Sequence, residues 1–362
     1  MIRCKGVMKK VAVAMSGGVD SAVAALLLKE SGHEVVGLTM CLGVAPAPGG
    51  PVKCCGPQEI EDARSVCHAL GIKHYVVDFA ADLEEKVIQP FVEEYCRGRT
   101  PNPCVACNRW IKFGSLLAKA QAWGFEGIAT GHYAAIEEKN GRYRMKIPKD
   151  RRKDQTYFLY AMPREALAMV IFPLAGYAKD EVRGIARRSG LPLFDKPESQ
   201  DICFIPAEGQ GAFLRSRGVG IAPGEIMDRQ GKVIGRHGGI ACYTIGQRTG
   251  LGIASPAPLY VTAIDAAQNR LVVGEKRELL SEGLTADRVN CLVDAFPEEA
   301  SAKIRYAHKA ARCRILKSGD HLTVRFMEPQ EAVSPGQSVV LYDDETVLGG
   351  GIIQEVFGGT GR

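Results

Sequence analysis

The fold is decided near the start of the chain by one stretch, Val11-Ala12-Val13-Ala14-Met15-Ser16-Gly17-Gly18-Val19-Asp20-Ser21. Its first five residues are apolar and predict a short buried strand over Val11–Met15. The next six form a glycine-containing turn, and Ala22–Ser31 reads as a helix that ends at Gly32. Glycines between a strand and a helix let backbone N–H groups approach a phosphate, and the helix dipole favours an anion. The stretch therefore predicts a phosphate-binding loop in an α/β fold.

Strands and helices continue to alternate after this stretch. Such alternation predicts a parallel, doubly wound α/β sheet. Ligands of these sheets bind beyond the carboxyl ends of the strands, where Ser16–Ser21, Met40 and Gly131 fall. The predicted strands are Glu34–Met40, Lys73–Phe79 and Gly127–Thr130, and the predicted helices are Gln58–Leu70, Asp82–Arg97 and Lys112–Trp123.

The pattern changes at about Gly209, where short strands separated by glycine-containing turns replace the alternation. We predict an α/β domain over residues 1–208, a small β-rich central domain over 209–280 and a C-terminal β-barrel over 281–362. The predicted later strands are Gly231–Ile234, Pro258–Ile264, Arg270–Gly274, His321–Phe326, Ser338–Tyr342 and Gly351–Val356.

Composition places the chain among ordinary globular proteins. Its 362 residues, 46% of them hydrophobic and 24% charged, suit two or three domains and exclude a disordered or collagenous chain. The longest uncharged stretch, Val35–Val52, is interrupted by prolines and glycines, so it does not form a membrane-spanning helix. The apolar run Val11–Met15 is too short for an export signal. We expect a cytoplasmic protein with no membrane partner.

Positive charge is concentrated in two segments, although the formal net charge is only +5. Residues 142–153 contain seven basic residues and one acidic residue, and residues 303–317 contain six basic residues and no acidic one. The rest of the chain is therefore net acidic. Two solvated basic faces would give the same pattern, but concentrated positive charge favours a polyanionic partner.

The glycine turn lacks the residues of the commonest nucleotide motifs. The chain contains neither the Walker pattern GxxxxGK[ST] nor GxGxxG at a strand end, which argues against γ-phosphate hydrolysis and dinucleotide binding. Ser16–Ser21 instead resembles the loop of N-type ATP pyrophosphatases. The resemblance implies that ATP is split between its α and β phosphates, with Mg²⁺ accompanying ATP and Asp20 helping to hold the cation. A tight turn without a ligand is the alternative.

Three of the twelve cysteines suggest sulfur chemistry. Cys104 and Cys107 lie three residues apart in a segment that we expect to be a proline-stiffened loop, and Ser199–Phe204 supplies Cys203. Thiolates carry transferable sulfur as persulfides, form a disulfide when they release it, and ligate iron. Unrelated structural cysteines are the alternative.

The loop and the cysteines together closely resemble the bacterial tRNA-specific 2-thiouridylases, which replace O2 of the wobble uridine with sulfur. The resemblance covers nearly the whole chain and is far more specific than any single motif. It implies tRNA as the substrate, namely the tRNAs for lysine, glutamate and glutamine, and a cysteine desulfurase or sulfur-carrier protein as the sulfur donor. The matching motifs are Ser16–Ser21, Thr100–Phe113, Ala129–Tyr133, Lys153–Tyr157, Ser199–Phe204 and Tyr243–Arg248.

The resemblance also implies a role for individual residues. Cys107 is expected to be the nucleophile and Cys203 the persulfide carrier. Lys153 and Arg305, which are expected to touch tRNA, fall inside the two basic segments. The implied ATP contacts are Ala14, Met15, Ser16, Gly17, Gly18, Val19, Asp20, Ser21, Met40 and Gly131; the implied tRNA contacts are Asn102, Pro103 and Cys104 at the target base, and Lys153, Asp154, Gln155, Arg305 and Tyr306 elsewhere.

One position departs from the family pattern, because many relatives have Asp where this chain has Cys104. An acid–base role for that Asp does not transfer to this chain. Cys104, Cys107 and Cys203 would suit three ligands of a [4Fe–4S] cluster whose fourth iron binds sulfide. The sequence leaves two routes open: cluster-bound sulfide, or a persulfide on Cys203 followed by a transient Cys107–Cys203 disulfide.

Two other functions fit parts of the sequence. Another N-type ATP pyrophosphatase, such as an amide- or argininosuccinate-forming synthetase, would leave the cysteine pair and the basic segments unexplained. An RNA-binding module with a vestigial nucleotide fold is disfavoured by the intact Gly17, Gly18 and Asp20. Tyr157 and Tyr306 fit stacking on an unpaired base and ordinary core packing equally well.

Overall fold

A computed structural model describes residues 9–43, 57–197 and 202–359 of the chain. The chain divides into two compact units. The first unit comprises Met1–Val87, Cys104–Phe204 and Glu345–Val347, and the second comprises Ile88–Pro103, Ile205–Asp344 and Leu348–Arg362. The three-domain division at residues 208 and 280 stays a prediction.

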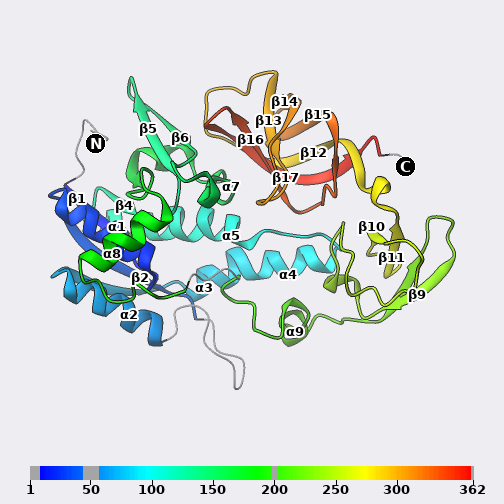
Figure 1. The fold of residues 1–362 in the computed structure, drawn as a ribbon, viewed down its shortest axis with the longest axis horizontal. Helices are drawn as coiled ribbons and strands as arrows, with labels where there is room; N and C mark the ends of the chain where they lie inside the picture. The colour runs from blue at the N-terminus through cyan, green and yellow to red at the C-terminus, as the bar shows by residue number, and fades with distance from the viewer. Residues whose placement is uncertain (1–8, 44–56, 198–201, 360–362) are drawn as a thin grey trace. The chain divides into compact units, whose positions relative to one another are not determined.

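The first unit is built on a five-stranded parallel sheet with strand order β3-β2-β1-β4-β7 (Figure 1). The central strand β1 (Lys10–Ala14) has Val11, Ala12 and Val13 fully buried. A strand covered on both faces is apolar without alternation, as this one is. The predicted α/β class is therefore confirmed. The other strands of this sheet are β2 (Glu34–Cys41), β3 (Lys73–Asp78), β4 (Gly127–Ala129) and β7 (Val170–Ile171).

Helices pack on this sheet through a shared apolar cluster. The cluster joins side chains of β1 and β2 to those of α1 (Val19–Glu30), α2 (Pro57–Ala69) and α8 (Lys179–Arg188). Eight of the twelve residues of α1 are buried, which explains why its sequence is apolar almost all round rather than on one stripe.

The segment that carries Cys104 and Cys107 is a helix, so the predicted loop is wrong there. The helix starts with α5 (Pro103–Ala106), continues as the π-helical η2 (Cys107–Leu116) and ends with α6 (Leu117–Ala122). Pro103 stands at the first helical position, where the missing N–H and the fixed φ of proline are tolerated. The proline therefore begins the helix rather than excluding it.

Further short elements complete the first unit. The predicted helix Asp82–Arg97 is observed as three successive helical pieces, of which the last belongs to the second unit. A hairpin of β5 and β6 carries part of the first basic segment. These elements are α3 (Ala80–Leu83), η1 (Glu84–Ile88), α4 (Gln89–Cys96), β5 (Ala135–Lys139), β6 (Arg142–Lys146), η3 (Arg151–Lys153), α7 (Thr156–Leu159) and η4 (Arg164–Met169).

The second unit contains a small sheet and a closed barrel. The sheet has strand order β10-β11-β8-β9, and the barrel has the order β12-β15-β14-β13-β16-β17 and closes by pairing of β12 with β17. The predicted β-rich region and C-terminal barrel are thus confirmed. The elements are α9 (Gln210–Ser216), β8 (Gly224–Met227), β9 (Val233–His237), η5 (Ile240–Cys242), β10 (Tyr260–Asp265), β11 (Arg270–Gly274), η6 (Lys276–Leu279), β12 (Leu280–Cys291), β13 (Glu299–Lys303), β14 (Ala311–Ser318), β15 (His321–Glu331), β16 (Ser338–Asp343) and β17 (Thr346–Phe357).

Each part of the second unit has its own apolar core. The barrel is filled by inward-facing residues such as Leu284, Val324 and Leu341, all fully buried. A separate cluster around Ile226 and Val261 supports the small sheet. Within the residues that the structure describes, no helix has the length and apolar character needed to cross a membrane.

Candidate active site

The loop after β1 is closed by hydrogen bonds between its two serines. The Ser16 backbone N–H donates to Ser21 Oγ at 3.3 Å, and Ser21 Oγ donates to the Gly18 carbonyl at 3.0 Å. Gly17 has φ +67°, and a Cβ there would lie 2.6 Å from the carbonyl oxygen of Glu59, so only glycine fits. Because α1 begins directly after Gly18, its unpaired N–H groups lie at the loop. This is the geometry of an anion cradle.

The segment after β4 packs against the same loop. A Cβ at Gly131 would lie 2.7 Å from both the Asp20 carbonyl carbon and the Ser21 nitrogen, so the two backbones are in direct contact. β1 and β4 are neighbours in the sheet, and their carboxyl ends therefore meet where ligands of such sheets bind. Met40 is the next-to-last residue of β2, at the same edge.

A buried lysine that the sequence analysis missed holds the acidic residue of the loop. Lys179 Nζ donates to both carboxylate oxygens of Asp20 at 2.7 Å, and only 7% of the Lys179 side chain is exposed. The Tyr133 hydroxyl donates to Asp20 Oδ1 at 3.0 Å. These three residues are far apart in the sequence, and no local motif marks Lys179 as part of the loop.

A second missed lysine contacts the glycines of the loop. Lys196 Nζ donates to the Gly17 carbonyl at 2.9 Å and to Asp62 Oδ2 at 2.6 Å. Burial works to raise the pKa of Asp62, but hydrogen bonds from Lys196 and Gln58 outweigh it and lower that pKa below its usual value. Two ammonium groups thus lie on the predicted phosphate loop, and a nucleotide triphosphate needs such charges.

The three predicted sulfur-site cysteines interact electrostatically. Cys104, Cys107 and Cys203 are half-buried cysteines. Burial raises the pKa of Cys104 to about 11, and the charges of Cys107 and Cys203 add to the rise while Lys112 opposes it. The pKa of Cys107 is likewise raised by burial, opposed by Lys112. Ser199, Gln200 and Asp201, which precede Cys203 in its motif, lie outside the described residues.

Lys112 also connects this cysteine pair to the segment after β4. It lies five residues beyond Cys107 in η2, and its Nζ is 3.3 Å from His132 Nε2. His132 Nδ1 is in turn 2.7 Å from Thr130 Oγ1. Burial and then the Lys112 charge lower the pKa of His132 well below its usual value, so this ring is neutral at pH 7.

Metal ligation is not built into the described part of the site. Within residues 9–43, 57–197 and 202–359, no three His, Cys, Asp or Glu side chains gather as ligands for a metal ion. The cysteines therefore do not fit a preformed cluster site in this arrangement. Asp20 already shares its carboxylate with Lys179 and Tyr133. Mg²⁺ commonly binds one carboxylate together with nucleotide phosphates, so Asp20 suits a cation that arrives with ATP.

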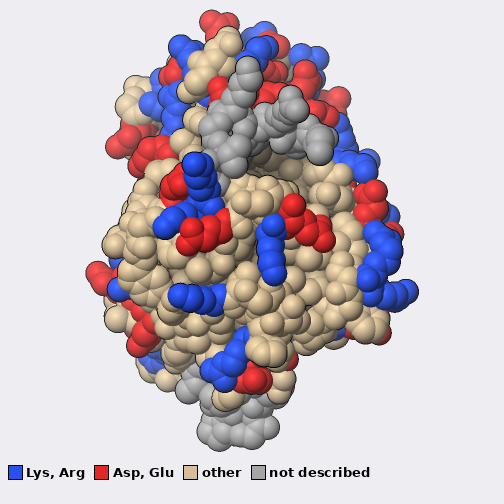
Figure 2. Space-filling view, turned by 90° about the vertical axis from the view of Figure 1, so that its left-hand side faces the viewer, with Lys and Arg blue, Asp and Glu red and all other residues tan. Residues whose placement is uncertain are grey.

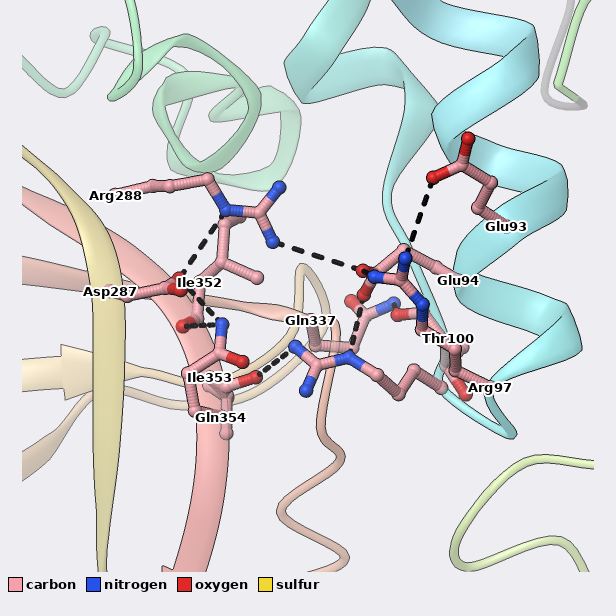
Figure 3. A network of polar contacts seen from close by, with 11 residues as sticks. Glu93, Glu94, Arg97, Thr100, Asp287, Arg288, Gln337, Ile352, Ile353 and Gln354 are labelled. Atoms are coloured by element: carbon pink, nitrogen blue, oxygen red, sulfur yellow. Dashed lines mark hydrogen bonds and ion pairs between the residues drawn. The ribbon is translucent and has the colours of Figure 1, made fainter. Parts of the chain in front are cut away.

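In the second unit, the segment that leads to Asn102 and Pro103 is bound to the barrel backbone (Figure 3). The Thr100 N–H donates to the Pro335 carbonyl at 2.9 Å, and Gln337 Nε2 donates to the Thr100 carbonyl at 2.9 Å. A Cβ on Gly336, the residue between them, would lie 2.9 Å from the Thr100 nitrogen. The contact therefore requires glycine.

An arginine cluster reinforces this attachment (Figure 3). Arg99 Nε donates to Glu94 Oε2 at 2.7 Å, and the Arg99 guanidinium also donates to the Ile353 carbonyl at 3.1 Å. Arg288 lies 4.0 Å from the same Glu94 carboxylate. Because Arg99 and Glu94 are both largely buried, removing either one would leave a buried charge unpaired, which costs more than breaking an exposed ion pair.

Comparison with known proteins identifies the family of this chain. Residues 9–207 match the family model described as "tRNA methyl transferase HUP domain", residues 212–275 its "PRC-barrel domain", and residues 281–353 the "Aminomethyltransferase beta-barrel domain". A protein of Syntrophus aciditrophicus named tRNA-specific 2-thiouridylase MnmA 1 is 55% identical over 96% of this chain and 93% of its own length. The chain belongs to the tRNA-specific 2-thiouridylase family. MnmA proteins of Geotalea uraniireducens (50% identity; 96% of this chain, 95% of the relative) and Clostridium acetobutylicum (47%; 96% and 99%) agree.

The residues that are expected to contact tRNA in this 2-thiouridylase differ in how exposed their side chains are. The Asp154 carboxylate is buried and accepts hydrogen bonds from the Thr156 N–H at 3.0 Å and the Thr156 hydroxyl at 2.6 Å. Tyr157 is fully buried and belongs to the core, whereas Tyr306 is 39% exposed. Of the two tyrosines considered for base stacking, only Tyr306 has an accessible ring. Arg305, beside it, donates to the Glu331 carbonyl at 3.3 Å.

One face of the molecule carries charges of both signs. On the face drawn in Figure 2, Lys and Arg side chains are interspersed with Asp and Glu side chains. That face is therefore not uniformly positive. The two basic segments remain the best candidates for phosphate contacts in a 2-thiouridylase.

Asp150 holds the start of the first segment that is predicted to contact tRNA. Hydrogen bonds from the Arg152 side chain and the Lys179 backbone lower the pKa of Asp150 to about 2. Because the folded pKa is depressed, Asp150 stabilises the fold above about pH 4, and that contribution is lost as the pH falls from about 4 to about 2. We expect Asp150→Asn to lower the free energy of unfolding by about 1 kcal/mol at pH 7, with a smaller difference at pH 3. Urea denaturation at both pH values checks this, and a difference that stays constant would contradict it.

Proposed function

We propose that this chain is an ATP-dependent tRNA 2-thiouridylase. ATP bound at Ser16–Ser21 adenylates O2 of the wobble uridine and releases pyrophosphate. Adenylation makes O2 a good leaving group, and sulfur then displaces AMP from C2. The tRNA domain descriptions and the thiouridylase names of relatives over nearly the full chain support tRNA as the substrate. A methyl transfer, which the domain description names, gives no role to the cysteine pair.

One observation carries this proposal: the Gly131-His132 dipeptide lies between the phosphate loop and the lysine that acts on the cysteine pair. Gly131 packs on the Asp20–Ser21 backbone of the phosphate loop, and His132 lies 3.3 Å from Lys112. Lys112 acts electrostatically on both Cys104 and Cys107. These contacts support the proposal that the adenylating loop and the sulfur-transferring thiols form one site in the first unit. A small-molecule synthetase has no need of that arrangement.

For sulfur transfer, we favour the persulfide route. Cys203 carries the outer sulfur, and the Cys107 thiolate attacks Cys203 Sγ and forms a Cys107–Cys203 disulfide. The S–S bond of the persulfide breaks and hydrosulfide leaves, which attacks C2 of the adenylated uridine. An external dithiol then reduces the disulfide. The raised pKa of Cys107 means that some group must take its proton before attack.

A [4Fe–4S] cluster on Cys104, Cys107 and Cys203 is the second candidate, favoured by Cys104 in place of the family's usual Asp. The described residues do not gather as metal ligands, so the cysteines would have to converge when a cluster is inserted. Iron and acid-labile sulfide assays on anaerobically purified protein separate the two routes. About four irons per chain would replace the persulfide proposal, and none would retain it.

Several finer assignments belong to this proposal. The substrates are the tRNAs for lysine, glutamate and glutamine, and a cysteine desulfurase or sulfur-carrier protein supplies the sulfur. Mg²⁺ accompanies ATP and offsets the charge of the leaving pyrophosphate. The protein works in the cytoplasm, where thiols stay reduced.

The test is retardation of tRNA on a mercury-containing gel. Unmodified tRNA is incubated anaerobically with the protein, ATP, Mg²⁺, and a cysteine desulfurase with cysteine, which supplies persulfide sulfur, beside a parallel reaction with sulfide and a control without ATP. We expect an ATP-dependent retarded band, because mercury slows thiolated RNA. If competent tRNA shows no shift, the small-molecule synthetase becomes the better assignment.

A further inference from the structure

Tyr133 makes hydrogen bonds to both predicted ligand-binding segments. Its hydroxyl donates to Asp20 Oδ1 in the ATP loop at 3.0 Å. Its backbone N–H donates to Gln155 Oε1 at 2.8 Å, and its carbonyl accepts from the Gln155 N–H at 3.0 Å. Gln155 belongs to the predicted tRNA-contacting segment. One residue, only 2% exposed, therefore touches both segments at once.

A second connection runs between the same two segments. Lys179 Nζ holds Asp20 through both carboxylate oxygens at 2.7 Å, and the Lys179 backbone N–H donates to Asp150 Oδ2 at 3.2 Å. Asp150 accepts from the Arg152 N–H at 3.2 Å, and its carbonyl accepts from the Lys153 N–H at 3.0 Å. Lys179 also lies over the Tyr133 ring, 5.8 Å from its centroid. Both connections therefore meet at the Asp20 carboxylate.

Asp20 is the point at which a bound nucleotide would act on these connections. Its side chain is 30% exposed, so it can respond to a nucleotide, while its partners Lys179 and Tyr133 are buried. Buried hydrogen bonds to a carboxylate are strong and directional, so ordering Asp20 restrains Tyr133. The Tyr133 backbone in turn restrains Gln155 through two hydrogen bonds, one to its side-chain oxygen and one from its backbone N–H. Ordering one segment thereby reduces the entropy cost of ordering the other.

We propose that Tyr133 is a positioning residue that couples ATP binding to tRNA binding. Each ligand then raises the affinity of the protein for the other by the same factor, as thermodynamic linkage requires. The enzyme thus binds ATP tightly only when tRNA is present, which limits unproductive hydrolysis of ATP. This inference rests on the ATP and tRNA assignments proposed above.

The test is Tyr133→Phe, which removes the hydroxyl and keeps the backbone contacts to Gln155. The dissociation constant of a non-hydrolysable ATP analogue is measured with and without unmodified tRNA. In the wild type we expect tRNA to tighten binding by about tenfold, within the usual range of allosteric coupling. Tyr133→Phe should reduce this factor to about twofold. The reciprocal titration, of tRNA with and without the analogue, should give the same factors.

A matched control separates coupling from a general loss of stability. Tyr95→Phe also removes a buried tyrosine hydroxyl with a hydrogen-bond partner, Gln210, but lies on neither connection. We expect it to keep the wild-type factor. An equal weakening by Tyr133→Phe with and without tRNA would overturn the inference, as would a wild type without coupling. Failure of the proposed function would instead show as no ATP-dependent retarded band in the mercury gel.

Discussion

Cys203→Ser abolishes thiolation of tRNA, with an expected loss of at least about a thousandfold, and leaves ATP binding within about twofold of the wild type. The persulfide route requires a sulfur at this position, and the serine hydroxyl carries no persulfide. The contacts that hold the ATP loop come from Lys179, Tyr133 and Gly131. Single-turnover thiolation on mercury gels and titration with an ATP analogue measure the two effects separately.

A second cysteine variant serves as the control for Cys203→Ser. Cys96 is an exposed free thiol at the end of α4, and Cys96→Ser is expected to retain full activity. Non-reducing mass spectrometry after one turnover without reductant should detect a Cys107–Cys203 disulfide in the wild type and in Cys96→Ser, but not in Cys203→Ser. Full thiolation by Cys203→Ser would rule out both the persulfide and the cluster routes.

Gly131→Ala is expected to weaken ATP binding by about tenfold to a hundredfold, because relieving a steric clash in a packed site costs about 1–3 kcal/mol and about 1.4 kcal/mol corresponds to a tenfold change in affinity. The new Cβ would lie 2.7 Å from the Asp20 carbonyl carbon and the Ser21 nitrogen, and 2.9 Å from Asp20 Cβ. These are mainly backbone atoms, so the clash is relieved only if the ATP loop moves. The position of α1 after the loop limits that movement. Calorimetric titration with the analogue measures the loss.

The control for this substitution is a glycine with free space around it. A Cβ on Gly176 would meet no atom within 4 Å among the described residues, so Gly176→Ala should bind the analogue like the wild type. Thermal unfolding of both variants shows whether the fold survives. Near-normal ATP affinity in a folded Gly131→Ala protein would place the nucleotide away from this contact.

The sequence predicts the sheet well because its signals are local. Apolar runs such as Val11–Met15 mark strands that are covered on both faces, and the glycine turn marks the edge at which they end. The class of fold and the barrel were confirmed for this reason. The helix at Pro103 was missed because proline usually signals a loop, and its tolerance at the first helical position depends on whether the residues after it continue as a helix.

The partners of the predicted site residues are harder to predict. Lys179 and Lys196 lie 159 and 179 residues beyond Asp20 and Gly17, and only the folded chain brings them to the loop. Whether Tyr157 and Tyr306 are accessible likewise depends on packing, since Tyr157 is fully buried and Tyr306 is 39% exposed. The roles assigned to Cys107, Cys203 and the tRNA contacts stay predictions until the variants are measured.

The bonding of Thr100 to Gly336 and Gln337 has a consequence for how this family can diversify. The barrel does more than add surface, because its backbone holds the chain at Thr100, four residues before Cys104. A barrel transplanted from a distant relative would need to bring a glycine and a side-chain amide at those two places, or the contacts that hold Thr100 would be lost. We therefore expect the barrel and the segment 97–103 to be inherited together as one evolutionary module, although they are far apart in the sequence.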